Sequence, residues 1–216
     1  MPHVGYADST GSLVPLSREI RVRKGTVSAK YCETCKTYRA PRSSHCRLCG
    51  NCVEGIDHHC TYLHNCIGRR NYTSFITFLV SAVICLVYSV VFAAIHYALL
   101  CHREGLTFAQ ALGNSPESAV NFMLGLILLG PVSALLGYHF YLMFINATTI
   151  ERLRHNTAKS VNPEDVTPNP FSYNSHIRNF IHMLCRPQSP SWIDASGWET
   201  ADQRIPNPGL VDQRGQ

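Results

Sequence analysis

The sequence predicts a mainly α-helical membrane protein, in which two transmembrane helices carry a cytosolic two-zinc domain of short hairpins and loops. Two observations predict this class. Of the 216 residues 45% are hydrophobic, but they concentrate in two long stretches. Between residues 30 and 72, in contrast, Cys, His and Arg are dense and aliphatic residues are few. Such a segment can hardly bury a core of its own, so metal ligation is expected to hold it.

The two apolar stretches, residues 75–95 and 119–145, contain no charged residue. A helix of about 20 residues spans a hydrocarbon core about 30 Å thick, so both are long enough to cross a membrane. We therefore expect transmembrane helices over residues 73–98 and 119–145, joined by a lumenal loop over residues 99–118. Pro131 is expected to kink the second helix.

Charge sets the expected orientation of this helical pair. Of the 19 Lys and Arg residues, only Arg103 lies in the loop between the helices, and the others lie before or after the pair. Because cytoplasmic segments carry the excess of positive charge, both ends of the chain are expected in the cytosol.

The two ends of the chain have irregular composition. Residues 1–29 are rich in Gly, Ser, Thr and Pro and then basic, which predicts a flexible arm. Residues 146–187 follow the second helix in the cytosol, and residues 188–216 are expected to be a disordered tail. From residue 155 onward the chain is rich in proline and should be mostly irregular, with one short amphipathic helix around residues 180–184 that could lie on the membrane surface.

The cysteine-rich segment has the spacing of metal ligands. The chain has 10 cysteines, and six of them fall between Cys32 and Cys60 with short Cys-x2-Cys spacings and interleaved histidines, which favours metal over a secreted disulfide framework. Zinc prefers four thiolate or imidazole ligands, so two closed sites use eight donors. The segment offers ten, which leaves one cysteine and one histidine over, and spacing alone leaves open which: Cys32, Cys35, His45, Cys46, Cys49, Cys52, His58, His59, Cys60 and Cys66.

The run Asp57-His58-His59-Cys60 suggests chemistry for that surplus. A thiol with an ordinary pKa near 8.5 is a minority thiolate at cytosolic pH unless a base or a positive field assists it. A neighbouring imidazole can supply the base, and a carboxylate can hold the imidazole in one tautomer. An inert zinc module has no need of such a group.

Two stretches, YRAPRSSHCRLCGNCVEGIDHHC and HNCIGRRNYTSF, resemble the DHHC family of protein S-palmitoyltransferases, and within it the fungal Ras palmitoyltransferase catalytic subunit. The resemblance covers residues 30 to about 187. It implies one zinc site made of Cys32, Cys35, His45 and Cys52. It implies a second made of Cys46, Cys49, His59 and Cys66. The residues left over, Cys60, His58 and Asp57, are then catalytic.

Two shorter motifs follow in the order of the family. Thr148-Thr149-Ile150-Glu151 resembles the TTxE motif that comes after the last helix. Asn169-Pro170-Phe171, together with Asn179, resembles the C-terminal motif that packs beneath the catalytic segment. Thr148, Thr149, Glu151 and Asn179 are therefore expected to support the site.

The resemblance implies a two-stage reaction. Cys60 would take palmitate from palmitoyl-CoA and pass it to a cysteine of a substrate protein, with ping-pong kinetics. Arg69 and Arg70, just before the first helix, could bind CoA phosphates or lipid headgroups. The implied partners are membrane lipids, palmitoyl-CoA, Ras-like substrate proteins and an accessory subunit, with no nucleic acid. The implied location is the endoplasmic reticulum membrane, with the Golgi as second choice.

Three features depart from the family. Tyr62 stands where the family carries Trp, and keeps an aromatic wall. His64 replaces an Asn and adds a possible competing ligand or base. The family normally has four transmembrane helices, and its first two are absent between Met1 and Lys30, so we expect an incomplete gene model or a short isoform. The alternative function is a catalytically inactive, membrane-anchored zinc-binding adaptor or a truncated family member.

Overall fold

The computed structural model describes residues 6–7, 13–14, 16–22, 24–165 and 168–186. The chain divides into two compact units. One unit joins Met1–Tyr72 to Leu142–Gln216, and the other is Thr73–Tyr141. The expected disordered tail, residues 188–216, lies outside the described residues.

The second unit is a helical hairpin. Its elements are α1 (Tyr72–Arg103), the short α2 (Phe108–Asn114) and α3 (Pro116–Ile145). Both long helices begin before the expected spans, and α1 also ends later. In the most apolar 18-residue stretches of α1 and α3, only 11% and 6% of the residues are buried inside the protein. Packing against the rest of the protein therefore does not explain why these side chains are apolar. By length and composition, both helices could cross a membrane.

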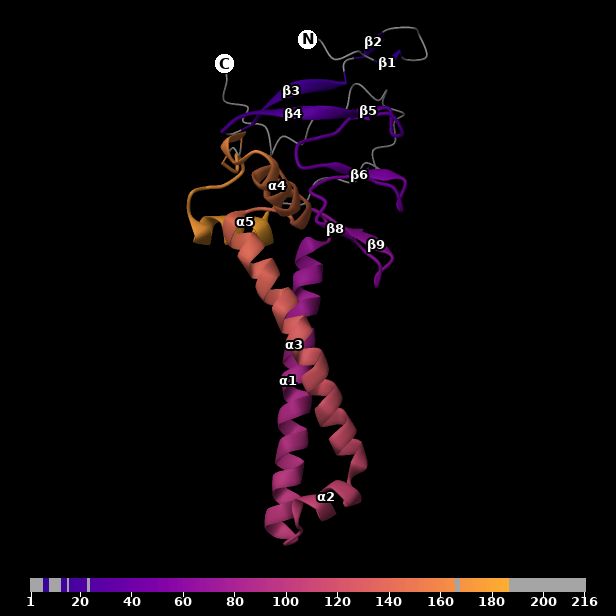
Figure 1. Cartoon of the computed structure of the whole chain (residues 1–216), viewed down its shortest axis with the longest axis vertical. Helices are drawn as coiled ribbons and strands as arrows, with labels where there is room; N and C mark the ends of the chain where they lie inside the picture. The colour runs from indigo at the N-terminus through magenta and orange to yellow at the C-terminus, as the bar shows by residue number, and fades with distance from the viewer. Residues whose placement is uncertain (1–5, 8–12, 15, 23, 166–167, 187–216) are drawn as a thin grey trace. The chain divides into compact units, whose positions relative to one another are not determined.

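Polar and close contacts join α1 to α3, which run side by side in Figure 1. Ser89 Oγ donates to Asn121 Oδ1 at 2.8 Å, and Tyr97 Oη donates to the carbonyl of Ser115 at 2.6 Å. A Cβ on Gly125 would lie only 2.7 Å from Val90 Cγ2, so glycine is what permits this approach. Pro131 lies inside α3, and the helix continues past it to Ile145.

The expected lumenal loop contains a helix, α2. Thr107 starts it with a capping box, in which the Thr107 side chain accepts from the Gln110 N–H and the Gln110 side chain accepts from the Thr107 N–H. That pairing satisfies backbone donors that the first turn would otherwise leave open.

The first unit begins with strands where a flexible arm was expected. β1 (Tyr6–Ala7) pairs with β2 (Leu13–Val14), and β3 (Ser17–Val22) pairs antiparallel with β4 (Gly25–Cys32). Over residues 17–22 and 25–29 the chain is therefore a strand pair and not the flexible arm that was expected. Ile20, Val22 and Ala29 are buried, and exposed polar or basic residues stand next to them along the strands. Composition alone therefore does not reveal the alternation of buried and exposed positions.

Three short hairpins carry the cysteine-rich segment. β4 pairs with β5 (Thr37–Tyr38), β6 (Ser44–Cys46) with β7 (Asn51–Val53), and β8 (His58–Cys60) with β9 (Asn65–Ile67). Around the last two of these hairpins, Cys46, Ile56 and Cys66 form a buried apolar cluster, with Cys49, Val53 and Ile150 packed against it.

The chain after α3 is more regular than expected. α4 (Thr149–Val161) is followed by η1 (Pro163–Asp165) and by α5 (His176–Cys185). α4 was not predicted, and residues 155–161 are helical where irregular chain was expected, whereas residues 187–216 of that stretch lie outside the described residues. α5 contains the short amphipathic helix expected around residues 180–184: Asn179 and Met183 are buried, whereas Ile177 and Ile181 are exposed.

Side chains from this later segment cap the end of α3. The last carbonyls of a helix have no partner within the helix. Asn179 Nδ2 donates to the Phe144 carbonyl at 2.8 Å, and Asn169 Nδ2 donates to the Ile145 carbonyl at 3.0 Å. These contacts hold α5 and Asn169 against the end of α3, a few residues before α4 begins.

Candidate active site and metal centres

Two groups of four side chains could each hold a metal ion. The first consists of Cys32, Cys35, His45 and Cys52, and the second of Cys46, Cys49, His59 and Cys66. In the first group, His45 Nδ1 lies 3.6, 3.4 and 3.9 Å from the three sulfur atoms. In the second, His59 Nδ1 lies 3.6, 3.4 and 3.7 Å from them. The structure thus brings together the two sets implied by the resemblance.

These distances fit zinc. With Zn–S near 2.3 Å and Zn–N near 2.0 Å, a tetrahedral site separates its sulfur and nitrogen ligands by about 3.5 Å. Burial and the neighbouring thiols Cys46 and Cys49 raise the pKa of Cys66 to about 12, so without a cation one donor of that group keeps its proton. A bound Zn²⁺ would offset the repulsion between the negatively charged sulfur atoms, because its positive charge favours deprotonation of the thiols that coordinate it.

The second group repeats the first, shifted by 14 residues (Cys32 to Cys46). In both groups the histidine follows the cysteines of the Cys-x2-Cys pair by 13 and 10 residues and precedes the last cysteine by 7. Cys60 occupies the position that would begin a third repeat, but Leu63 stands where its second cysteine would be. Cys60, the surplus thiol, therefore stands at the first ligand position of a third repeat whose second cysteine is missing.

Strand alternation separates the ligand His59 from its neighbours. His59 pairs with Cys66 across β8 and β9, so these two ligands share a face. Successive side chains of a strand point to opposite faces, which places His58 and Cys60 together on the other one. One three-residue strand thus presents a metal ligand on one side and an imidazole with a thiol on the other.

Asp57 precedes β8 and is fully buried. Its Oδ1 accepts from the Thr149 backbone N–H at 2.8 Å, and its Oδ2 accepts from the Thr149 hydroxyl at 2.7 Å. Thr149 is the first residue of α4, where the helix dipole and open N–H groups favour a negative charge. The carboxylate is therefore held at a helix N-terminus by two donors of one residue.

His58 completes the contacts of that carboxylate. Its Nδ1 lies 2.8 Å from Asp57 Oδ2, which assigns the proton to Nδ1 and leaves Nε2 as the base. The hydrogen bond to Asp57 raises the pKa of His58, and burial opposes this effect only in part. His58 is thus oriented and made more basic by Asp57.

Cys60 is a buried thiol that ionises more readily than an ordinary one. Burial raises its pKa, but the backbone of Leu63, the His58 side chain and the backbone of Tyr62 act against burial, and the resulting pKa lies below the ordinary value. The three residues Asp57, His58 and Cys60 therefore have the geometry of a carboxylate, a base and an activated nucleophile.

The TTxE residues of the sequence have distinct positions. Thr148 caps α4, with its hydroxyl accepting from the Glu151 N–H and its own N–H donating to Glu151 Oε2 at 2.9 Å. Thr149 holds Asp57, as described above. Asn179 is buried and caps the end of α3.

Sequence reasoning missed Arg42, whose side chain is only 3% exposed. It donates to both carboxylate oxygens of Glu151 at 2.8 Å and to Asn146 Oδ1 at 2.9 Å. No spacing or local pattern in the sequence pairs it with Glu151, which lies 109 residues away.

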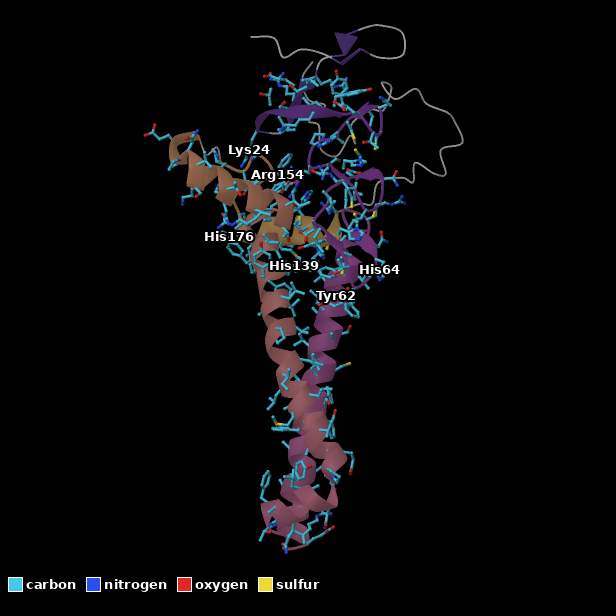
Figure 2. All side chains as sticks on the ribbon, turned by 45° about the vertical axis from the view of Figure 1, so that its right-hand side comes forward. Lys24, Tyr62, His64, His139, Arg154 and His176 are labelled. Atoms are coloured by element: carbon cyan, nitrogen blue, oxygen red, sulfur yellow. The ribbon has the colours of Figure 1, made fainter. Side chains whose placement is uncertain are left out.

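Other residues singled out in the sequence lie at the surface or in structural pairs. Arg69 forms an ion pair with Glu54 at 2.6 Å and is mostly buried, so its guanidinium already has an acid partner, whereas Arg70 is exposed. Tyr62 and His64 lie in the exposed loop between β8 and β9 (Figure 2). His64 has a φ of 47°, a backbone conformation found mostly in turns, and it belongs to neither group of four donors.

A family model described as DHHC palmitoyltransferase matches residues 26–156. Palmitoyltransferase ZDHHC18-B of Danio rerio is 39% identical over 191 residues, covering 88% of this chain and 49% of that protein. Palmitoyltransferase ZDHHC18 of Mus musculus is 37% identical over 205 residues, covering 93% and 53%. Palmitoyltransferase ZDHHC14 of Homo sapiens is 37% identical over 200 residues, covering 91% and 40%. The chain spans about half the length of the relatives it matches.

Proposed function

This chain belongs to the DHHC palmitoyltransferase family, and on that premise we propose that it is a protein S-acyltransferase. It transfers palmitate from palmitoyl-CoA to protein cysteines through an acyl intermediate on Cys60. The single observation that carries the proposal is the set of Asp57, His58 and Cys60, in which a buried carboxylate orients a half-buried base next to a buried thiol of lowered pKa.

In the first stage, the Cys60 thiol gives its proton to His58 Nε2 and its sulfur attacks the thioester carbonyl. A bond forms from Cys60 Sγ to the acyl carbon, and the bond from that carbon to the CoA sulfur breaks. The leaving CoA thiolate takes the proton back from the His58 imidazolium, which Asp57 stabilises.

In the second stage, a substrate cysteine attacks the acyl carbon and Cys60 leaves as a thiolate. His58 accepts the proton of the incoming thiol and returns it to Cys60. One thioester replaces another of similar energy, so the reaction needs a good leaving thiol and no ATP. Ping-pong kinetics follow, because CoA departs before the second substrate reacts.

The two groups of four donors would hold two structural zinc ions. Each would keep all four positions filled by protein, so zinc would fix the hairpins and leave the chemistry to Cys60. The Asp57–His58–Cys60 set depends on the second group most directly, because His59 lies between two of its members on β8.

The helices α1 and α3 would cross the membrane, as their length, composition and exposed apolar faces support. With the excess of Lys and Arg outside the loop between them, the metal centres would lie in the cytosol. The endoplasmic reticulum membrane, and next the Golgi, is the proposed location. Arg70 is exposed and lies just before α1, where it could meet CoA phosphates or lipid headgroups.

The matched relatives are named as palmitoyltransferases, without a substrate in the name. The fungal Ras palmitoyltransferase resemblance therefore has no support from them. A Ras-like substrate and an accessory subunit are proposals that rest on the two quoted sequence stretches alone.

The test is formation of the acyl-enzyme. Purified chain in lipid is incubated with a clickable palmitoyl-CoA analogue, and the label is measured before and after hydroxylamine. We expect a hydroxylamine-sensitive label that Cys60→Ser abolishes and that Cys185→Ser, at an exposed thiol of α5, retains. Zinc content should be equal in both variants. An unlabelled, zinc-replete wild-type chain would instead favour the membrane-anchored adaptor.

A further inference from the structure

Arg42 occupies an unusual place in the turn between β5 and β6. It is a buried arginine with a φ of 64°, a backbone conformation that side chains other than glycine rarely adopt. Its guanidinium plane lies over the Phe171 ring, 4.9 Å from the centroid. A strained backbone and a buried charge persist only where surrounding contacts demand them.

Those contacts converge on the start of α4. Arg42 Nε and Nη2 each donate to one carboxylate oxygen of Glu151 at 2.8 Å, the bidentate geometry that arginine provides and lysine cannot. The remaining donors bind the loop before the helix: Nη1 reaches Asn146 Oδ1 at 2.9 Å, and Nη2 reaches the Asn146 carbonyl at 3.1 Å. Arg42 therefore fixes both the first turn of α4 and the residues that lead into it.

The same first turn holds the catalytic carboxylate. Glu151 closes the capping box with Thr148, and Thr149 lies between them. Both donors of Thr149 bind Asp57. A shift of this turn would move the Thr149 donors away from Asp57, and with them the orientation of His58.

We propose that Arg42 is a positioning residue for the acyl-transfer reaction, acting through Glu151 and Thr149 on Asp57. It touches no reacting atom. The consequence for catalysis rests on the proposed function. The effect on the reactivity of the Cys60 thiol rests on the contacts described above. Its effect should pass through Asp57 and should leave palmitoyl-CoA binding unchanged.

Two readouts test this role in the full chain. The first is the rate constant for alkylation of Cys60 by iodoacetamide, followed by mass spectrometry, which needs no acyl transfer. The second is the rate of acyl-enzyme formation at saturating palmitoyl-CoA, with its apparent KM. We expect Arg42→Gln and Arg42→Lys to slow both rates by about tenfold, a part of the 10² to 10⁴ that a positioned base contributes. KM should stay within about twofold.

Glu151→Gln is the decisive partner variant. Glutamine can still accept from the Thr148 N–H in the capping box, but it removes the charge that Arg42 binds. We expect Glu151→Gln to slow alkylation by as much as Arg42→Gln, and the double variant to be no slower than either one. In an Asp57→Asn background, Arg42→Gln should have no further effect.

The matched control is Arg21→Gln, at an exposed arginine of β3, which should leave both rates unchanged. Zinc content and melting temperature are measured for each variant. If Arg42→Gln slows alkylation equally with and without Asp57, its role is only structural and the proposal fails. If the wild-type chain forms no acyl-enzyme while alkylation shows the expected pattern, the proposed function fails and the positioning role stands.

Discussion

Asp57 carries a negative charge in a fully buried position, where an unpaired carboxylate would be costly. Thr149 compensates that cost with two hydrogen bonds, and His58 adds a third. Of the two Thr149 donors, only the hydroxyl can be removed without disturbing the backbone, so it measures part of what the helix N-terminus contributes to the site.

Thr149→Val removes the hydroxyl and keeps both the shape of the side chain and the backbone N–H. A hydrogen bond to a charged group contributes about 1.5–3 kcal/mol, so Asp57 should be less firmly held and acyl-enzyme formation should slow by about tenfold. Thr157→Val, on the exposed part of α4, is the control and should retain the wild-type rate. Single-turnover labelling with palmitoyl-CoA measures both. An unchanged rate in Thr149→Val would mean that the backbone N–H suffices.

His58 determines how Cys60 responds to pH. Burial raises the pKa of the thiol, whereas His58 lowers it. His58→Gln removes the His58 contribution and leaves burial and the backbone hydrogen bonds of Leu63 and Tyr62, so the pKa of Cys60 should rise. Because the thiolate is the form that reacts, the alkylation profile should move to higher pH and the rate at neutral pH should fall.

The measurement is the pH dependence of Cys60 alkylation in zinc-loaded protein. His176→Gln, on the exposed start of α5, is the control and should keep the wild-type midpoint. Zinc content must be unchanged in His58→Gln, since a loss would identify His58 as a ligand. A midpoint that stays in place would show that the backbone around Leu63 alone activates the thiol.

Among the elements, the sequence predicted best what depends on residue type and spacing. The two long helices followed from uninterrupted apolar stretches, and the metal groups from the Cys-x2-Cys pairs. The hairpin of β3 and β4 was missed, because its alternating apolar residues lie among basic and polar ones. α4 was missed although Thr148 and Glu151 have capping-box spacing, because no apolar stripe follows them.

Contacts over long separations were beyond the sequence. Arg42 meets Glu151 across 109 residues, and Thr149 meets Asp57 across 92. Nothing in local propensity or spacing pairs such residues. The resemblance gave the TTxE and C-terminal motifs a role near the site, but the structure shows which atom each one holds.

Gly125 allows α3 to approach α1 closely, so a larger residue there tests how the helical hairpin packs. A methyl group at Gly125 would press on Val90 Cγ2, and valine is too stiff to turn aside. Gly125→Ala should therefore destabilise the hairpin by about 1–3 kcal/mol. The measurement is thermal unfolding in lipid, followed by circular dichroism.

Gly130→Ala provides the matched control. It lies on the same helix, where an added Cβ meets nothing within 4 Å. It gains the same helix propensity without the contact, so its melting temperature should not fall. Val90→Ala combined with Gly125→Ala should restore stability. If both glycine variants melt alike, the close approach does not limit the packing.

For the whole molecule, the repeat explains how one segment contains both a scaffold and a reactive site. The hairpin of β6 and β7 gives His45 and Cys52 to the first metal group and, from the opposite face, Cys46 to the second. The next hairpin gives His59 and Cys66 to the second group and presents Cys60 on its opposite face. Because the hairpin of β6 and β7 gives ligands to both groups, the groups should depend on one another.

Loss of either metal group should therefore affect more than its own ligands. We expect two zinc ions per chain in the wild type and in Cys60→Ser, but one or fewer in Cys32→Ser and in Cys46→Ser. Structural zinc contributes roughly 10–16 kcal/mol in small finger peptides, so both ligand variants should lose the hairpin fold and the acyl-enzyme together. Zinc content by atomic emission and protease resistance of the first unit are the measurements. A Cys32→Ser chain that keeps one zinc and full Cys60 acylation would show that the groups are independent, and that only the second one shapes the site.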